Sequence, residues 1–309
     1  MRASAVEGPA NTDASPQSEA ATDDPAAATP RSAWEDAVAR QAEELQARFE
    51  QAVVRIVVLD AAGSIVAQHG PIETPHPTAS TIKSFTVAAA LAEGVGADDP
   101  LDLTEGEGVQ VGSRRVRDYK GHGTVTVNAA LARSSNVAMV RLAERTGERP
   151  LYDRVGKVVP LPAREDLDDA TALGHLFGSG LTLSTLDLAR GYATLAAGGR
   201  NPATGAQLVP EAAARGVLDM LRYAVEAAEG TGNAAASPGW QVAGKTGTAQ
   251  NDTHNTALFF GIAERNGTTH IIGVVVSGVP HDQTGGSLAA AAVADLLARV
   301  PETAAPGAA

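Results

Sequence analysis

The sequence predicts a mixed α+β fold, in which an antiparallel sheet is flanked by helices and an all-helical subdomain occupies the middle of the chain. Strand-like patterns lie towards the two ends, at residues 53–67 and 240–279, whereas residues 80–221 are mainly helical in pattern. Strands from both ends can complete one sheet while helices pack on its faces. With 44% hydrophobic residues over 309 positions, the chain can bury such a core.

The two ends of the chain differ from this folded region. Residues 1–31 are mostly Ala, Pro, Ser, Thr, Asp and Glu and contain no aromatic side chain. Such a segment cannot bury enough apolar surface to offset its ordering entropy. We therefore predict a disordered acidic tail over 1–31, one folded domain over 32–300 and a flexible tail over 301–309.

The first predicted element is a helix that begins at Ser32. Ser32-Ala33-Trp34-Glu35 has the S-x-x-E form of a capping box, in which the hydroxyl and the carboxylate satisfy each other's backbone amides. The apolar face of this helix is marked by Trp34, Val38, Leu45, Phe49 and Val53.

A hairpin follows the first helix. Residues 53–59 are rich in β-branched side chains, residues 60–63 end in glycine as a turn, and residues 64–67 form the second strand. Towards the other end, residues 240–243, 257–263 and 270–279 are predicted strands, and the Ala-rich segment 288–300 is a closing amphipathic helix.

Charge and metal-ligand content exclude several functions. Lys and Arg total 24 against 36 Asp and Glu, a formal net charge of −12, so nucleic acid is not an expected partner. The chain has no cysteine, and its seven histidines show neither HxxxH nor HExxH spacing. We therefore expect no metal site and no cofactor.

No segment predicts a membrane span. The nearest candidate, the apolar run at residues 271–276, is far shorter than the roughly 18–20 residues that a spanning helix needs. The sequence as it stands also begins without the apolar stretch of a signal peptide. Either the protein is cytosolic, or an export segment or anchor is missing from a shortened chain.

The first motif with chemical meaning is Ser80-Thr81-Ile82-Lys83. If a helix starts at Ser80, Lys83 lies beside the serine hydroxyl at the positive end of the helix dipole. A serine nucleophile needs an adjacent base, and a lysine can be that base only if burial or nearby cations lower its pKa. Alone, the motif is equally an ordinary helix cap with a surface lysine.

The second motif is Ser134-Ser135-Asn136, between predicted helical segments at 127–133 and 137–144. In a tight turn, Ser134 and Asn136 can both point into one cleft, where a hydroxyl relays protons and an amide holds a lysine or a substrate carbonyl. By itself the segment is also explained as a cap between two helices.

The third motif is Lys245-Thr246-Gly247-Thr248 on a predicted strand, which could equally be an ordinary edge strand. Lys245 and Gly247 would face one way and the two threonines the other, and the glycines leave the backbone open to close approach. Two of the chain's four lysines lie in these motifs. The four are Lys83, Lys120, Lys157 and Lys245.

In this order, S-x-x-K, S-x-N and K-T-G resemble the signature of the penicillin-binding protein and serine β-lactamase superfamily. The resemblance runs from about residue 41 to 300 and includes the segments 131–137, 178–199 and 242–250. The chain is most similar to monofunctional class B transpeptidases, without their pedestal and membrane anchor. A penicillin-binding transpeptidase fold is therefore implied.

The resemblance implies a D,D-transpeptidase that cross-links peptidoglycan. Ser80 would attack the penultimate D-Ala carbonyl of a stem peptide and form an acyl-enzyme, which penicillins would also form. Lys83 would be the base, Ser134 would relay the proton to the leaving amine, and Asn136 would fix Lys83 and the substrate amide.

The third motif would complete the site. Lys245 would tune the proton relay, and the segment Thr246, Gly247 and Thr248 would bind substrate, with the two hydroxyls holding its terminal carboxylate. The backbone N–H groups of Ser80 and Thr248 would form the oxyanion hole.

The resemblance also implies location and partners. The substrate would be peptidoglycan stem peptides, β-lactams would be covalent inhibitors, and the protein would work outside the cytoplasmic membrane, on the periplasmic or cell-wall side. A membrane glycosyltransferase and divisome or elongasome proteins are further candidate partners.

Three alternatives remain open. A D,D-carboxypeptidase or a β-lactamase would pass the same acyl group to water, and a sensor or scaffold module would keep it. The second motif has Ser135 where class A β-lactamases have Asp, the loop 165–169 lacks their Asn, and Asn136 replaces the aliphatic residue of class D. Neither hydrolytic class fits these residues.

Overall fold

The computed structural model describes residues 32–103, 108–118 and 123–302. The tail predicted over 1–31 lies outside the described residues, as do residues 303–309 of the predicted C-terminal tail. No helix in the described ranges is both long and apolar enough to cross a bilayer.

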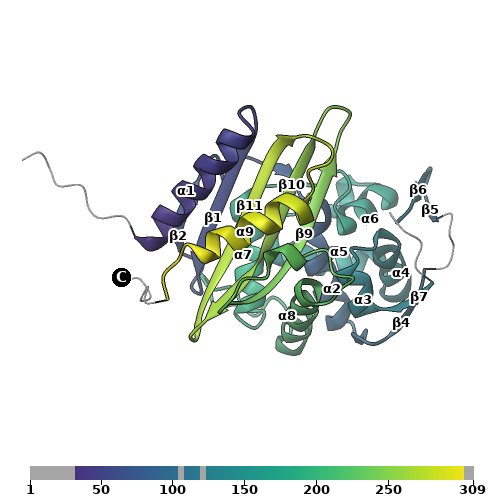
Figure 1. Ribbon diagram of the computed structural model, residues 1–309. Helices are drawn as coiled ribbons and strands as arrows, with labels where there is room; N and C mark the ends of the chain where they lie inside the picture. Colours follow the sequence, from purple (N-terminus) through teal and green to yellow (C-terminus); the bar gives the residue numbers. More distant parts are fainter. Residues whose placement is uncertain (1–31, 104–107, 119–122, 303–309) are drawn as a thin grey trace, which may run out of the picture. The chain divides into compact units, whose positions relative to one another are not determined.

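A five-stranded antiparallel sheet runs through the domain (Figure 1). Its strand order is β2 (Ile65–His69), β1 (Val53–Asp60), β11 (Thr268–Val279), β10 (Asn255–Arg265) and β9 (Gln241–Gln250). The N-terminal hairpin therefore pairs with the C-terminal strands, Val57 opposite Gly273, which confirms the predicted mixed fold. β9 forms one edge of the sheet.

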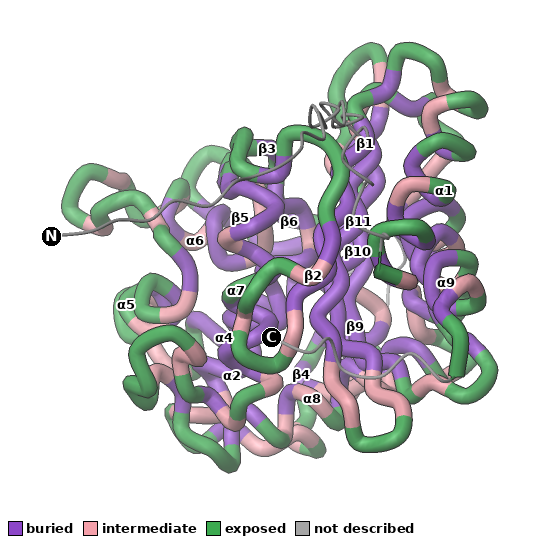
Figure 2. The backbone as a smooth tube through the Cα atoms, turned by 90° about the vertical axis from the view of Figure 1, so that its left-hand side faces the viewer, coloured by how far each residue is buried: buried purple, intermediate pink, exposed green. Residues whose placement is uncertain are grey.

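Two terminal helices cover one face of the sheet, as Figure 2 shows. They are α1 (Ala33–Arg48) and α9 (Ala290–Ala298), the latter preceded by a π-helical turn at Gly285–Ala289. The capping box predicted at Ser32 is present. The apolar residues of these helices pack against side chains such as Ile56 and Phe259 from the sheet.

The first helix ends earlier than its predicted apolar face. The prediction that this face continues through Phe49 to Val53 is wrong, because α1 stops at Arg48 and Val53 begins β1. The Gln46 side chain donates to the carbonyls of Phe49, Glu50 and Ala52. These bonds join the last turn of the helix to the connection that leads into β1.

The opposite face is covered by α7 (Thr185–Ala196), α8 (Glu211–Glu226) and the helical subdomain beyond them. In its described residues that subdomain also contains three two-stranded ribbons of two or three residues per strand, too short to show a sequence period. Its helices are α2 (Lys83–Ala92), α3 (Val127–Ala132), α4 (Asn136–Thr146), α5 (Glu148–Val158) and α6 (Asp169–Phe177). The ribbons pair β3 (His76–Pro77) with β8 (Thr182–Leu183), β4 (Pro100–Asp102) with β7 (Thr124–Thr126) and β5 (Val109–Val111) with β6 (Arg114–Val116).

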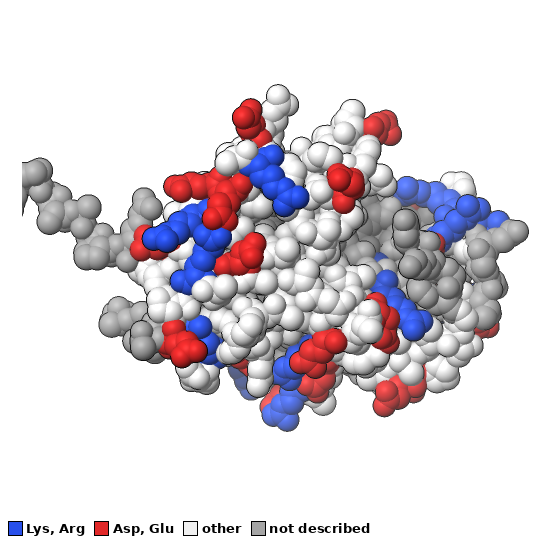
Figure 3. All heavy atoms as spheres, viewed as in Figure 1, with Lys and Arg blue, Asp and Glu red and all other residues white. Residues whose placement is uncertain are grey.

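Charged side chains lie singly or in small mixed groups on the described part of the face in Figure 3. The ion pairs of the described residues include Arg299 with Glu44 at 2.6 Å and Arg222 with Asp219 at 2.9 Å. Exposed pairs of this kind contribute little to stability, so the fold depends on its apolar core.

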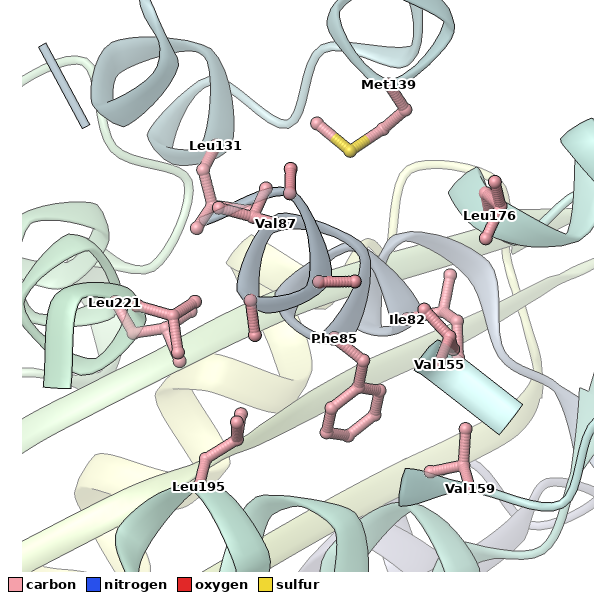
Figure 4. Packing of buried hydrophobic residues seen from close by; sticks show 14 of the residues in the cluster. Ile82, Phe85, Val87, Leu131, Met139, Val155, Val159, Leu176, Leu195 and Leu221 are labelled. Atoms are coloured by element: carbon pink, nitrogen blue, oxygen red, sulfur yellow. The ribbon is translucent and has the colours of Figure 1, made fainter. Parts of the chain in front are cut away.

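Helix α2 lies at the centre of the helical subdomain. Figure 4 shows its side chains Phe85 and Val87, with Ile82 from the turn just before it, surrounded by apolar residues from the other helices. The ring of Phe85 is 5.1 Å from that of Tyr192, which is 5.9 Å from that of Phe260 in the sheet. This aromatic column joins α2, α7 and β10.

The buried hydroxyl of Tyr192 also fixes the start of α2. It donates to the carbonyl of Thr81 at 3.0 Å and lies 2.8 Å from the Ser84 hydroxyl. Because a phenol has a single hydrogen, Ser84 is the donor in the second bond. The turn that carries Ser80 is thereby tied to the core.

We expect the Tyr192→Phe variant to lose about 1–3 kcal/mol of unfolding free energy, since buried partners of the hydroxyl are left unpaired. Urea unfolding followed by circular dichroism measures this. The control is Tyr223→Phe, where the lost hydroxyl bonds to the exposed carboxylate of Glu229, and it should change stability by less than about 0.5 kcal/mol. Equal effects in both variants would contradict the role of Tyr192.

Candidate active site

Ser80 lies in a 3-10 turn, Ala79–Ile82, and the α-helix begins only at Lys83. The condition under which Lys83 was expected beside the serine, an α-helix that starts at Ser80, is therefore not met. Ala79 has a φ of 46°, outside the helical region, and the Thr81 hydroxyl donates to the Thr78 carbonyl at 2.6 Å. Side chains at i and i+3 eclipse in a 3-10 turn, so Ser80 and Lys83 still face the same side.

Lys83 joins the first motif to the second. Its side chain is fully buried, and Nζ donates to the Ser134 carbonyl and to Asn136 Oδ1, both at 2.6 Å, with Ser134 Oγ at 3.5 Å. Burial lowers the pKa of Lys83 from 10.5 to about 7, against the opposing attraction of the Asp118 carboxylate. A substantial fraction of Lys83 is therefore a free amine near neutral pH.

The second motif forms the start of α4. Ser134 has a φ of 61°, and Ser135 is the N-cap, whose Oγ accepts from the Ala138 amide. The helix begins at Asn136, one residue before the predicted segment. The Ser134 carbonyl and the Asn136 amide oxygen therefore both face Lys83, whereas the Ser134 hydroxyl, to which the motif gave the proton relay, is farther away at 3.5 Å.

Asp118 completes this arrangement and was missed by the sequence analysis. One carboxylate oxygen accepts the amides of Asn136 at 2.6 Å and Val137 at 3.1 Å, and the other accepts the Ser135 hydroxyl at 2.6 Å. A single acidic residue in a loop has no recognisable pattern. The only available signal was that a helix starting at Asn136 needs acceptors for its first amides.

The third motif lies on the edge strand β9, with Lys245 opposite Phe260 and Gly247 opposite Leu258 on β10. Gly247 lies against the turn of the first motif: a Cβ there would be 3.4 Å from the Ser80 nitrogen and 3.2 Å from the Ala79 Cβ. The absence of a side chain thus lets β9 approach Ser80 closely.

Lys245 is buried on the same side of β9 as Gly247, and its Nζ donates to the Thr246 carbonyl at 3.1 Å. The pKa of Lys245 lies well below 10.5, mainly because the side chain is buried and to a smaller extent because Lys83 repels a second positive charge. Two ammonium groups that interact within a buried site oppose each other's protonation.

The two threonine hydroxyls make intramolecular bonds. Thr246 Oγ1 donates to Thr231 Oγ1 at 2.7 Å, and Thr248 Oγ1 accepts the Gly285 amide at 3.0 Å. Thr246 is buried whereas Thr248 is exposed. Thr231, whose amide donates to the Ala132 carbonyl, links the strand to α3 and was also missed.

The loop considered for a deacylating base carries no free carboxylate facing inwards. Glu165 and Asp166 are exposed, and Asp168 caps α6 by accepting the Thr171 amide at 2.7 Å. Asp169 pairs with Arg164. Among the described residues, no group of three or more His, Cys, Asp or Glu side chains is placed to hold a metal ion.

A family model described as the penicillin binding protein transpeptidase domain matches residues 41–298. A Pseudomonas aeruginosa protein named probable peptidoglycan D,D-transpeptidase PbpC is 26% identical over 253 residues, which cover 71% of this chain and 44% of that protein. Peptidoglycan D,D-transpeptidase FtsI of Escherichia coli is 29% identical over 196 residues, which cover 55% and 33%. This chain thus spans less than half the length of these curated relatives.

Solved structures share the fold. A structure described as a peptidoglycan glycosyltransferase from Burkholderia ambifaria has a TM-score of 0.77 at 24% identity, covering 85% of this chain and 93% of that one. The transpeptidase domain of penicillin-binding protein 3 from Burkholderia pseudomallei also has a TM-score of 0.77, at 22% identity, covering 86% and 92%.

We expect Lys245→Met to raise the unfolding free energy at pH 7, because the folded state no longer has to hold a lysine whose protonated form it disfavours. In the parent protein the folded pKa of Lys245 lies well below 10.5. The pKa of this lysine in the unfolded chain is close to 10.5. At pH values between the folded and the unfolded pKa, the unfolded chain binds one more proton than the folded protein, so stability rises with pH.

Urea unfolding at several pH values between 7 and 10 measures this effect, and the variant should show a shallower rise with pH. Lys157→Met is the control, because Lys157 is exposed on α5. A Lys245→Met variant that is less stable than its parent at pH 7 would mean that the lysine is held by favourable contacts that outweigh its desolvation.

Proposed function

The chain belongs to the penicillin-binding protein transpeptidase family, and we propose that its site transfers acyl groups from D-Ala-D-Ala stem peptides of peptidoglycan through Ser80. The observation that carries this proposal is the buried Lys83, three residues from Ser80, with a pKa lowered to about 7 and both acceptors of the second motif at 2.6 Å. A lysine that is partly unprotonated near neutral pH can act as a base.

In the acylation step, Ser80 Oγ attacks the penultimate D-Ala carbonyl and gives its proton to Lys83. The bond from that carbonyl to the terminal D-Ala nitrogen then breaks. The proton passes to the leaving amine through Ser134, whose Oγ lies 3.5 Å from Lys83 Nζ. The products are an ester at Ser80 and free D-Ala.

Backbone donors would stabilise the negative charge that develops on the attacked carbonyl. The amides of Ser80 and Thr248 are suited to this role because Gly247 brings β9 against the Ser80 turn. Substrate would have to displace the bond that Thr246 donates to Thr231, whereas the Thr248 hydroxyl accepts the Gly285 amide and keeps its O–H to donate to the carboxylate. Lys245, which interacts electrostatically with Lys83, would tune the proton relay through its own protonation state.

The acceptor of the acyl group decides between cross-linking and hydrolysis. The relatives named D,D-transpeptidases support an amine acceptor and therefore a cross-linking reaction. The loop carboxylates at 165–169 are exposed, capping or ion-paired, which argues against a dedicated base for water. Three further points remain predictions: that the protein works outside the cytoplasmic membrane, that β-lactams inhibit it covalently, and that it has partners in glycan polymerisation or cell division.

We expect wild-type protein incubated with benzylpenicillin to gain the mass of one drug molecule, and Ser80→Ala to gain none, because the hydroxyl that forms the ester is removed. Intact-mass spectrometry measures this. Ser64→Ala, a change at an exposed turn residue, is the control and should label fully.

An adduct that persists in Ser80→Ala would identify another nucleophile. For the wild type, a long-lived adduct together with exchange of labelled D-Ala in a stem peptide supports the transpeptidase. A short-lived adduct with accumulating hydrolysed drug would indicate a β-lactamase, and an adduct without exchange would indicate a sensor.

The acylation rate constant should rise as pH increases through about 7, since the neutral Lys83 amine is the active base and its pKa is about 7. Lys83→Ala should lower that constant by about 10²–10⁴-fold while reversible binding of the drug persists. Stopped-flow measurements with a chromogenic cephalosporin give both quantities. Wild-type rates in Lys83→Ala would exclude Lys83 as the base, and Lys157→Ala serves as the control.

A further inference from the structure

Asp118 follows the β5–β6 ribbon and accepts three hydrogen bonds at the start of α4. Its Oδ1 takes the amides of Asn136 and Val137, at 2.6 and 3.1 Å, and its Oδ2 takes the Ser135 hydroxyl at 2.6 Å. The Ser135 hydroxyl in turn accepts the Ala138 amide at 2.9 Å. All of the first three helical amides are therefore satisfied by these two side chains.

This first turn holds both acceptors of Lys83. The Ser134 carbonyl precedes the N-cap residue Ser135, and the Asn136 side chain follows it. Asn136 Nδ2 donates to the Arg117 carbonyl at 3.1 Å, next to Asp118 in the chain. Because the amide nitrogen is anchored there, its oxygen is the atom turned to Lys83.

We propose that Asp118 is a positioning residue of the site, whose carboxylate fixes the first turn of α4 and thereby sets the geometry and the protonation of Lys83. The inference rests on the proposed function, because Lys83 matters only if it is the base. The backbone of this turn needs such support, since Ser134 has a φ of 61° that a non-glycine residue rarely adopts.

The charge of Asp118 acts on Lys83 in the opposite direction to burial. Burial lowers the Lys83 pKa, and the carboxylate raises it. The other charged group that interacts with Lys83 is Lys245 on β9, and the two lysines oppose each other's protonation. The phenol of Tyr192 on α7 bonds Ser84, next to Lys83, and its raised pKa keeps it neutral. Asp118 is thus the negative charge that keeps Lys83 titrating near neutrality.

The test is Asp118→Asn, which keeps the shape and an acceptor oxygen for the helix amides but removes the charge. The rise of the acylation rate constant with pH should move about one pH unit lower. The high-pH plateau should change by less than about threefold. A loss of rate at all pH values with an unmoved midpoint would show a purely structural role and overturn the inference.

The matched control is Asp168→Asn. Asp168 also accepts a backbone amide at a helix N-terminus, from Thr171 at 2.7 Å, but it is not among the charges that act on Lys83. Its removal should leave the midpoint of the rate profile in place. An equal shift in both variants would reflect the change of net charge and contradict a specific role for Asp118.

A second measurement needs no acylation. With only four lysines in the chain, protein labelled with ¹³C at lysine Cε gives few NMR signals, and Lys83→Arg identifies the signal of Lys83. Its titration midpoint should be lower in Asp118→Asn than in the parent. If the parent fails to react with penicillin, the proposed function fails while this titration still tests Asp118. If the parent reacts and neither midpoint moves, the inference about Asp118 fails alone.

Ser135→Ala provides an independent variant, because it leaves the charge and removes one of the three anchors of Asp118. Here the midpoint should stay near that of the parent, and the plateau of the acylation rate should fall several-fold as Asn136 loosens. An unchanged plateau in Ser135→Ala would contradict the positioning role.

Discussion

The rest of the site depends on the burial of one lysine, Lys83. Lys83 has no access to water, so each of its donors needs a protein acceptor, and burying the charge without them would be costly. The acceptors come from the turn before α4, some fifty residues along the chain. That turn is held by Asp118, and α2 is held by the apolar core of the helical subdomain and by Tyr192. Packing of several elements is therefore needed to keep one lysine partly neutral.

Backbone strain gathers at the same place. Three non-glycine residues in the described ranges have positive φ angles, and two of them, Ala79 and Ser134, lie next to the nucleophile or in the second motif. Such conformations cost roughly 1–3 kcal/mol each and persist only where the surroundings enforce them. Around Ala79 the enforcement is close packing: a Cβ at Gly178 would lie 1.8 Å from the Ala79 carbonyl oxygen, and Gly247 approaches from β9.

The sequence predicted those helices, strands and site residues that are marked by a hydrophobic period or by a motif. The capping box at Ser32, the hairpin after it, and the C-terminal strands follow from patterns that local chemistry dictates. The three motifs named residues that do lie together, with Lys83 bonded to Ser134 and Asn136, and Gly247 beside Ser80. Asp118 and Thr231 could not be found this way, because each is one polar residue in a loop whose partners are distant in sequence. The helix start at Lys83 was missed because the Ala79 conformation is imposed by tertiary packing.

The basic residues of the chain support the need for titratable cations in the site. Lys and Arg total 24, of which four are lysines, so 20 are arginines. An arginine at position 83 or 245 could not lose its proton, and its planar guanidinium would not fit the acceptors of an ammonium group. The two lysines in the motifs are both fully buried. Burial lowers both pKa values, so folding must either bury an ammonium group or remove its proton, and either costs stability. A chain that otherwise favours arginine retains lysine where a proton must be given up, and accepts the lower stability there.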